Sequence, residues 1–314
     1  MKIAYIITGY TDPKQLRRLV GALTFTPFEI GNTDFYIHID KKVDITPFVD
    51  AMNGCIADVF WSKERFWINW GGFNQVLSQY ELLRMIFEET KRKYDRVICL
   101  SATDYPLWSN RKIVSELTIH ADVEYVGGYN LVTSKDDAQR SKVYNYHFFR
   151  DLRLPLKYKR AICFISRIIM RNLPFKKSIS FLGTFGRKYD VYSGSDYWGI
   201  TYDCAKFVYE TMKSDKKLMD YFKYSYIPSE SVVNTIIFNS DYKERCAIQI
   251  EQDYYPGLEA LTPLHYTSYK KAIKIYKESD WEELQSTDRM FFRKAKSGIS
   301  DTLIERLENE VRQK

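Results

Sequence analysis

The chain has 314 residues, a formal net charge of +7 and 16% aromatic residues. It is long enough to bury a substantial core, and neither a repeat nor a low-complexity linker divides it, so we expect one domain over residues 1–314. The positive charge favours anionic partners such as phosphates, nucleic acid or an acidic membrane surface. The sequence contains no run of about 20 apolar residues, so we expect no bilayer-spanning helix.

The cysteines are odd in number, widely spaced and mostly set among apolar neighbours, which predicts buried thiols in a reducing compartment rather than a disulfide framework. They are Cys55, Cys99, Cys163, Cys204 and Cys246. No CxxC or HExxH pattern suggests zinc. The first apolar run, residues 2–8, is too short for a signal peptide, so we expect a cytoplasmic protein or one peripheral on the cytoplasmic face of a membrane.

The first part of the chain alternates apolar strands with helices, which predicts an α/β sheet. The expected strands are residues 3–8, 34–40, 59–62 and 96–101. Asp12 and Pro13 predict the N-cap and first position of a helix after the first strand. Asp40 and Asp104 stand at or just past strand ends, where α/β sheets bind ligands. Asp40 would receive a ribose or base there, or else only cap a turn.

Residues 65–73 read as a loop that carries three aromatic rings into a glycine pair. A long helix should follow, with a buried side formed by Val76, Leu77, Tyr80, Leu83 and Phe87. Asn110 is expected to cap the next helix of this half.

Residues 150–177 are rich in Lys and Arg interleaved with apolar side chains, and Asp151 is their only acid. Such a basic amphipathic stretch is typical of a helix on an anionic membrane surface. The alternative is a solvated basic face over an ordinary core helix. Nucleic-acid binding is disfavoured because no recognised binding motif accompanies the charge.

Residues 192–237 hold the strongest site signal. Small residues at 193–195 allow a close approach of the backbone to a ligand, and Tyr197 and Trp198 offer flat apolar faces on which sugar rings stack. Pro228 and Ser229 predict a helix start with Ser229 as N-cap, which places Glu230 in the first turn. Glu230 is therefore a candidate general base; alternatively it only complements the helix dipole.

The last part of the chain predicts a loop at 251–257 and an edge strand at 265–269. Ser279 and Glu282 have the spacing of a capping box. Arg293 and Lys294 form a dense cationic spot. Alternatively, they are only part of a solvated basic turn.

Six motifs, taken together and in order, resemble the core-2/I-branching glycosyltransferase family, number 14 among glycosyltransferases, which includes the peptide O-xylosyltransferases. They are residues 37–40 (IHID), 70–73 (WGGF), 100–107 (LSATDYPL), 194–198 (GSDYW), 228–230 (PSE) with Thr235, and 292–294 (FRK). The chain lacks the membrane anchor and disulfides of the Golgi members, so it resembles a bacterial relative on the cytoplasmic side of the inner membrane.

The resemblance implies an α/β GT-A-type fold: a central mixed, mostly parallel sheet flanked by helices. It implies a nucleotide-sugar-binding half at 1–125, an acceptor-binding and catalytic half at 126–314, and inverting transfer from a UDP-sugar. It also implies independence from metal and from any cofactor, and the sequence contains no Asp-x-Asp motif of the kind that binds the donor's metal in most GT-A enzymes.

The family's catalytic Glu maps onto Glu230, and its Lys that neutralises the leaving UDP maps onto Lys294. The family's Arg falls at His265, a departure for which a protonated His265 or Arg293 compensates. The remaining residues are assigned by side of the site. The donor side is expected to hold Thr8, Asp40, Arg65 and Asp104, and the acceptor side Trp70, Asp196, Tyr197 and Trp198.

The leading hypothesis is an inverting, metal-independent transferase that adds N-acetylglucosamine or xylose in a β linkage to a glycan or lipid-linked hydroxyl, in bacterial surface polysaccharide synthesis. The alternative is a non-catalytic module that binds glycan or nucleotide-sugar. Residues 150–177 would add peripheral contact with an anionic membrane, and no nucleic-acid partner is expected.

Overall fold

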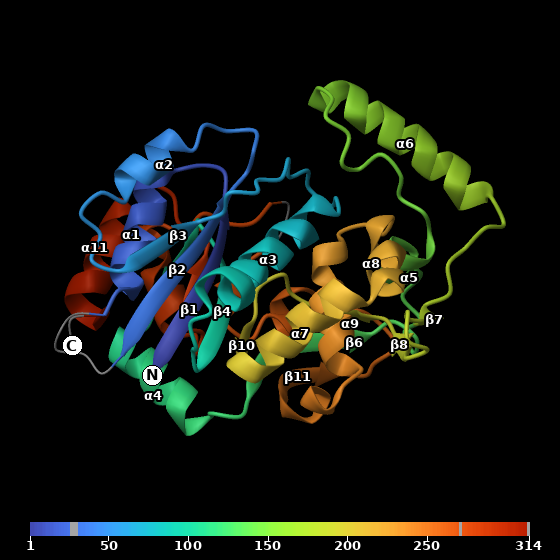
Figure 1. Ribbon diagram of the computed structural model, residues 1–314. Coiled ribbons are helices and arrows are strands. Elements are labelled where there is room, and N and C mark those ends of the chain that lie inside the picture. Colours follow the sequence, from blue (N-terminus) through green and yellow to red (C-terminus); the bar gives the residue numbers. More distant parts are fainter. Residues whose placement is uncertain (26–30, 270–271, 313–314) are drawn as a thin grey trace.

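The computed structural model describes residues 1–25, 31–269 and 272–312 (Figure 1). In spatial order its main sheet is formed by β11 (Cys246–Ile250), β6 (Glu124–Asn130), β10 (Gly199–Thr201), β4 (Arg96–Ser101), β1 (Lys2–Gly9), β2 (Asn32–Ile39) and β3 (Asp58–Trp61), and β9 (Tyr192–Ser193) pairs with β6. β10 and β9 run antiparallel to their neighbours, whereas the other pairs are parallel. The predicted mixed, mostly parallel α/β sheet is confirmed.

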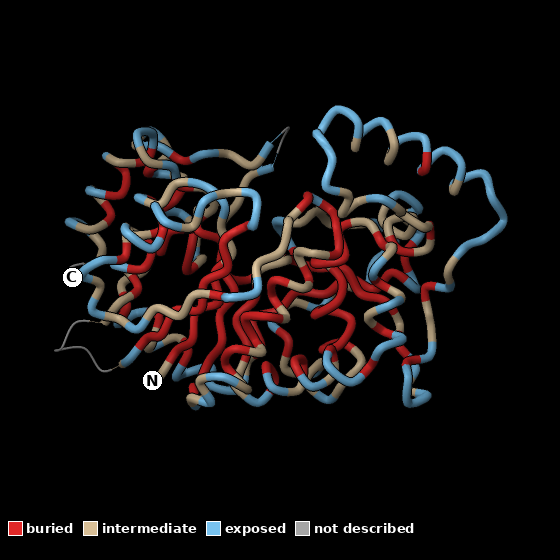
Figure 2. The backbone as a smooth tube through the Cα atoms, turned by 45° about the horizontal axis from the view of Figure 1, so that its top comes forward, coloured by how far each residue is buried: buried red, intermediate tan, exposed pale blue. Residues whose placement is uncertain are grey.

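Helices cover both faces of this sheet because its buried strands are apolar on both sides. In β1, Ile3, Tyr5 and Ile7 face one core and the intervening Ala4 and Ile6 face the other. The helices of the first core are α1 (Pro13–Leu23), α2 (Thr46–Ala51) and α4 (Asn110–Ile119), and those of the second are α3 (Asn74–Arg84), α7 (Tyr202–Ser214), α8 (Lys216–Lys223) and α9 (Val232–Phe238). Figure 2 shows the buried strands between these exposed outer surfaces.

A small second sheet joins the end of the chain to the middle of the first half. Its order is β12 (His265–Thr267), β13 (Phe291–Arg293) and β5 (Asp104–Pro106). A third core lies beside it, with α10 (Trp281–Gln285) and α11 (Asp301–Leu307). The small sheet places β12 and β13 at the carboxyl end of β4.

The remaining elements lie outside these layers or extend them. They are α5 (Asp137–Tyr144), α6 (Leu156–Asn172), the hairpin β7 (Ser180–Leu182) and β8 (Lys188–Asp190), 3₁₀ turns at Pro228–Glu230, Asp241–Arg245, Glu259–Leu261 and Glu278–Asp280, and π-helical turns at Met85–Thr90 and Glu308–Arg312. Figure 1 shows α6 standing apart from the body of the molecule. Within the part of the chain that the structure describes, no helix combines the length and the apolar character needed to cross a bilayer.

Several predicted local features are confirmed. The side chain of Asp12 accepts a hydrogen bond from the Gln15 backbone N–H at 3.0 Å and so caps α1. The predicted edge strand is β12, at the edge of the small sheet. All five cysteines are free, and three of them are buried: Cys99, Cys204 and Cys246.

Three predicted caps are wrong. Ser109, not Asn110, caps α4, because the Ser109 hydroxyl accepts from the Lys112 N–H and Asn110 is the first helical residue. Ser279 lies inside a 3₁₀ turn, and the Asp280 carboxylate instead accepts from the Lys277 N–H at 2.9 Å. Ser229 caps no helix, because it lies inside the 3₁₀ turn Pro228–Glu230.

Candidate active site

Asp104 is the centre of a buried charged cluster at the carboxyl end of β4. Its carboxylate accepts hydrogen bonds from the Ser101 N–H at 2.7 Å, from His265 Nε2 at 3.1 Å and from Arg293 Nη1 at 3.0 Å. The small sheet explains this meeting, because Arg293 in β13 stands directly opposite Asp104 in β5. The cluster therefore depends on pairing between strands nearly 190 residues apart in sequence.

The cluster is charged. Burial by itself would raise the pKa of Asp104, but Arg293 and His265 outweigh it and hold that pKa below its ordinary value. Burial opposes the charge of Arg293 as well, yet Tyr197, Asp104 and Asp196 together keep the pKa of Arg293 above its usual range. An ionised pair of this kind is tolerated in a core only because each partner is hydrogen-bonded to the other.

Tyr197 and Lys294 border this cluster. The Arg293 guanidinium lies over the Tyr197 ring, 4.4 Å from its centroid, and His265 lies 5.3 Å from the same ring. Lys294 is half-buried, and burial together with the charge of Arg293 lowers its pKa. Its ammonium group makes no hydrogen bond or ion pair within the described residues, so two adjacent cations here are only partly neutralised.

Glu230 lies at the end of a 3₁₀ turn rather than in a helix. Ile227 takes a left-handed backbone conformation with φ of 51°, the turn covers Pro228–Glu230, and α9 starts only at Val232. The predicted N-cap role of Ser229 is therefore wrong. The Glu230 carbonyl accepts from the Gly194 N–H at 2.7 Å, which fixes the turn against the segment of small residues after β9.

The Glu230 carboxyl group is largely buried, with 15% of its side chain exposed. Burial, followed by the charge of Asp196, raises its pKa to about 7, and Lys142 opposes this shift from 3.5 Å. Two carboxylates that share a buried site disfavour each other's ionisation. Glu230 is thus a carboxyl group that exchanges its proton near neutral pH.

Asp196 connects Glu230 to the Arg293 cluster. It accepts a hydrogen bond from Gln75 Nε2 at 2.7 Å, and Gln79 binds its backbone carbonyl at 3.1 Å, so α3 holds it in place. Burial raises the pKa of Asp196, against the opposing charge of Arg293. Because Asp196 interacts electrostatically with both Glu230 and Arg293, the two groups of charged residues form one site.

Gly194 is required by the close approach of the Gly127 backbone and the Asn234 side chain. A Cβ atom at this position would lie 2.0 Å from the Gly127 carbonyl oxygen and 2.6 Å from the Asn234 side-chain oxygen. No larger residue fits, because of packing within the protein; the predicted approach of residues 193–195 to a ligand stays a prediction.

The acceptor-side residues differ in exposure. Trp70 is 65% exposed and packs edge-on against Tyr226 with ring centroids 5.4 Å apart, so its ring is free to contact a ligand. Trp198 is only 1% exposed and belongs to the main core, which corrects the expectation that its face stacks on a sugar. Tyr197 already carries Arg293 on its ring.

The predicted donor-side residues lie near one another at the carboxyl ends of β1, β2 and β4. Thr8 stands opposite His38 in one neighbour and Ser101 in the other. Arg65 donates to the carbonyls of Ile39 and Asp40 at 2.9 and 2.8 Å.

The Asp40 carboxylate is itself occupied by the loops that follow β2 and β3. It accepts from the backbone N–H groups of Lys42 at 2.9 Å and Ile68 at 3.2 Å. Together with Arg65 it therefore shapes the loop after β2, and direct contact of either side chain with a donor stays a prediction.

Lys142 and Gln75 were missed by sequence reasoning. Both lie on helices whose sequences carry no motif, and Lys142 is separated from Glu230 by 88 residues. Nothing in the sequence alone indicates the ion pair of Lys142 with Glu230 or the hydrogen bond from Gln75 to Asp196.

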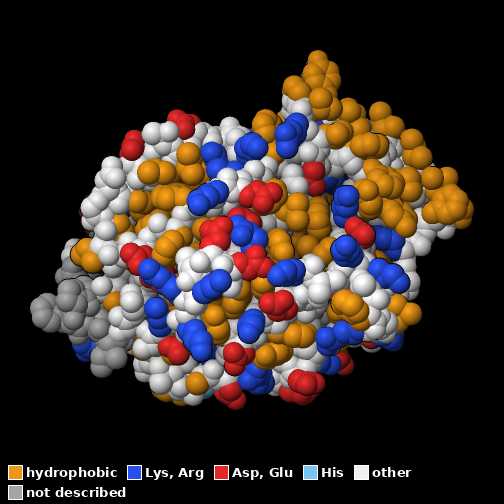
Figure 3. Space-filling view, in the orientation of Figure 1, with side chains coloured by type: hydrophobic (Ala, Val, Ile, Leu, Met, Phe, Trp, Pro, Cys, Tyr) orange, Lys and Arg blue, Asp and Glu red, His pale blue; other side chains and the backbone are white. Residues whose placement is uncertain are grey.

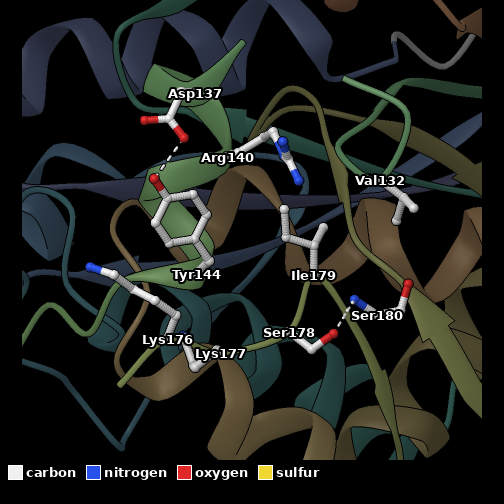
Figure 4. Close-up of a pocket in the computed structure, with 9 residues that line it drawn as sticks. All are labelled: Val132, Asp137, Arg140, Tyr144, Lys176, Lys177, Ser178, Ile179 and Ser180. Carbon is white, nitrogen blue, oxygen red and sulfur yellow. Dashed lines mark hydrogen bonds between the residues drawn. The ribbon is translucent and has the colours of Figure 1, made fainter. Parts of the chain in front are cut away.

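A separate hollow of about 560 Å³ lies beside α5, as Figure 4 shows. It is lined by Val132, Asp137, Arg140, Tyr144 and residues 176–180. None of the predicted site residues lines it. Its walls are the outer face of α5 and the segment that follows α6, so it marks where that segment rejoins the body.

The described parts of the chain, 1–25, 31–269 and 272–312, contain no group of three His, Cys, Asp or Glu side chains placed so that they could hold a metal ion. Asp104, the carboxylate best placed at a strand end, is occupied by Arg293, His265 and a backbone N–H.

The sequence model of the family described as "Branch: Core-2/I-Branching enzyme" matches residues 3–252. The chain belongs to the Core-2/I-Branching enzyme family. The match covers the three carboxyl groups of the site, Asp104, Asp196 and Glu230, whereas His265, Arg293 and Lys294 lie beyond it. The family resemblance inferred from the six motifs is confirmed.

Individual relatives of this Core-2/I-Branching chain are distant. It is 21% identical to Xylosyltransferase oxt of Drosophila melanogaster over 98% of this chain and 33% of that protein. It is 23% identical to human Xylosyltransferase 1 over 77% of this chain and 22% of that protein. The chain thus spans a third or less of the length of these curated relatives.

Solved structures give weaker matches. Staphylococcus aureus TarS 1-349 in complex with UDP-GlcNAc has 16% identity and a TM-score of 0.27, over 39% of this chain and 31% of that one. Core-mannan synthase A (CmsA/Ktr4) of Aspergillus fumigatus, in its Mn/GDP form, has 10% identity and a TM-score of 0.34, over 77% and 71%. At these TM-scores the likeness carries no argument about the site.

Proposed function

We propose that this Core-2/I-Branching chain is an inverting glycosyltransferase in which Glu230 is the general base. The observation that carries the proposal is the buried Glu230 carboxyl group with a pKa of about 7, fixed by the backbone of Gly194 and flanked by Asp196. A base with a pKa near the working pH accepts a proton efficiently and is still ionised often enough to do so.

The reaction requires one displacement at the sugar's anomeric carbon. The acceptor hydroxyl oxygen forms the new bond to that carbon while its proton passes to a Glu230 carboxylate oxygen. The bond from the same carbon to the donor's phosphate oxygen breaks, and the nucleoside diphosphate leaves with the electron pair. One carboxylate is enough for this stereochemistry, since no covalent sugar intermediate forms.

The leaving diphosphate gains negative charge, which fixed cations stabilise without reorganisation. Lys294 and Arg293 are the candidate groups, because Lys294 has no ionic partner within the described residues and Arg293 lies beside it. His265 is completely buried and bonded to Asp104, so we assign it a positioning role for Arg293 rather than contact with the diphosphate. The proposed chemistry requires no metal or cofactor.

The donor we propose is a UDP-sugar carrying N-acetylglucosamine or xylose, and the acceptor is a glycan or lipid-linked hydroxyl in bacterial surface polysaccharide synthesis. Two relatives are named xylosyltransferases, which supports this choice. The exposed Trp70 ring beside Tyr226 supplies an apolar face on the acceptor side. We place the protein in the cytoplasm or peripherally on the inner membrane.

Calorimetric titration of UDP, UDP-N-acetylglucosamine and UDP-xylose, once with EDTA and once with manganese, tests the proposal. We expect binding that EDTA does not change, because Lys294 and Arg293 replace a metal. Binding that appears only with manganese would refute metal independence. If none of the nucleotides binds, the chain would instead be a glycan-binding module without transferase activity.

Replacing Lys294 by Met should lower kcat about 100-fold, the usual effect of removing one group that stabilises developing charge. The melting temperature should not fall, because the Lys294 ammonium makes no hydrogen bond or ion pair within the described residues and its burial already lowers its pKa. Steady-state kinetics and thermal unfolding measure the two effects. Lys296→Met, at an exposed position two residues on, is the matched control and should change neither.

A further inference from the structure

Helix α6 exposes most of its apolar side chains to solvent. Ile165, Ile168 and Ile169 are between 46 and 57% exposed, and Tyr158 is 62% exposed. Ser166 is the only buried residue of α6. This finding rules out an ordinary core helix, the alternative that the sequence left open, because a core helix would bury these side chains. Figure 2 shows the helix as an exposed rod beside the buried body.

The outward surface of α6 is divided lengthwise into two stripes. Tyr158, Ile165 and Ile169 recur at intervals of seven and four residues and form an apolar stripe. Arg160, Arg167 and Arg171 each follow one of these residues by two positions, so they form a basic stripe about 200° around the helix from the apolar one. All three are exposed, as are Phe164 and Ile168, which lie between the two stripes. Figure 3 shows apolar side chains gathered in the region where α6 lies in Figure 1, with Lys and Arg side chains nearby.

The charged residues of α6 and of the chain on either side of it, from 152 to 189, are all of one sign. Residues 152–189 contain no Asp or Glu, so nothing within this stretch neutralises the arginine stripe. A two-fold contact between two copies through the apolar stripe would leave the arginines of both copies without an anionic partner from α6. An anionic phospholipid bilayer satisfies both stripes at once, since its headgroups attract the arginines and its acyl chains accept the isoleucines.

Both ends of α6 are attached to the body. Before the helix, the Asp151 carboxylate accepts from the Phe73 N–H at 2.8 Å, and Arg150 donates to the Trp70 carbonyl at 2.9 Å. After it, the Lys177 N–H donates to the Tyr144 carbonyl at 2.8 Å, beside the hollow of Figure 4. The helix is therefore presented by the fold and does not belong to a loose tail.

We propose that α6 binds the surface of an anionic phospholipid bilayer, lying in the interface with Ile165 and Ile169 inserted and Arg160, Arg167 and Arg171 among the headgroups. Arg150 and Asp151 attach this helix to the loop that carries Trp70. If the proposed transferase activity is correct, the bound orientation brings the acceptor side towards the membrane, as a lipid-linked acceptor requires.

Vesicle co-flotation of the full chain tests the proposal without any donor or turnover, so its result is independent of the proposed activity. Vesicles of phosphatidylcholine alone are compared with vesicles containing about 30 mol% phosphatidylglycerol. We expect binding to the anionic vesicles only, and its loss when NaCl is raised from about 50 to about 500 mM.

Two variants locate the contact. Ile165→Asp with Ile169→Asp should weaken vesicle binding at least roughly 100-fold, because each inserted isoleucine contributes about tenfold. Arg167→Ser with Arg171→Ser should weaken it about 30-fold in low salt, because each arginine near the anionic surface contributes about 1 kcal/mol. All four positions are exposed, so we expect unchanged melting temperatures.

Helix α4 supplies matched controls, since Ile119 is 71% exposed and Arg111 is also exposed, far from α6 in Figure 1. Ile119→Asp and Arg111→Ser should bind vesicles as the unaltered chain does. No binding to anionic vesicles in low salt, or binding that the α6 variants leave unchanged, would overturn the proposal. A dimer in light scattering that the isoleucine variants abolish would assign α6 to a second copy instead.

Discussion

Glu230→Gln is expected to lower the rate of sugar transfer by about 10²–10⁴ while UDP binding is retained. Gln fills the same space and keeps the backbone contact with Gly194, but it cannot accept the acceptor's proton. In the unaltered chain the rate should fall about tenfold per pH unit below pH 7, because Glu230 becomes protonated there. Rates of UDP release over a pH series, with calorimetry of UDP, measure both effects.

The same substitution should stabilise the fold in alkaline solution. Because the pKa of Glu230 is raised from 4.5 in the ordinary carboxyl to about 7 in the folded chain, its contribution to stability is present below the lower value and lost as the pH rises through the higher one. At about pH 8, Glu230→Gln should therefore increase the free energy of unfolding by up to roughly 3 kcal/mol.

Glu305→Gln, at an exposed position in α11, is the control and should change neither transfer nor unfolding. Equal loss of UDP binding and transfer in Glu230→Gln would count against its role as base, and a pH-independent rate would do the same.

Asp104→Asn should lower the free energy of unfolding by about 3 kcal/mol at about pH 7, because it leaves the buried Arg293 guanidinium without its counter-charge. The pKa of Asp104 lies below its ordinary value, so this stability is present above the ordinary carboxyl pKa and lost as the pH falls through the lowered one. The difference from the unaltered chain should thus shrink in acid. Urea unfolding at several pH values measures it.

Asp288→Asn, where the side chain is 91% exposed, is the control for charge removal and should be neutral. The double variant Asp104→Asn with Arg293→Met should be less destabilised than the sum of the single ones, since it removes both charges together. Strict additivity would show that the two groups do not interact.

The sequence predicted β1, β2, β3, β4 and β12 and proposed Glu230 for the site, because strand runs and the family motifs are local patterns. It misplaced the start of α9, since the turn at Pro228–Glu230 is set by a hydrogen bond from Gly194, which is remote in sequence. It also placed the Trp198 ring at a surface, because an aromatic residue is equally suited to a core.

Lys142 and Gln75 were beyond prediction for a different reason. Each lies in a helix of ordinary composition, and only the packing of that helix against the site brings its side chain to Glu230 or Asp196. The contacts of His265 likewise depend on tertiary structure that the sequence does not reveal. Its motif position suggested contact with a diphosphate, but its pairing with Asp104 depends on the small sheet.

That small sheet has a consequence for the chain as it leaves the ribosome. Asp104 and Glu230 are both synthesised before His265 and Arg293, which are the residues that neutralise Asp104. A growing chain can therefore complete the main sheet while Asp104 still lacks its partners. Only when β13 is released and pairs with β5 does the site close, so the site should form in one step and only after β13 has left the ribosome.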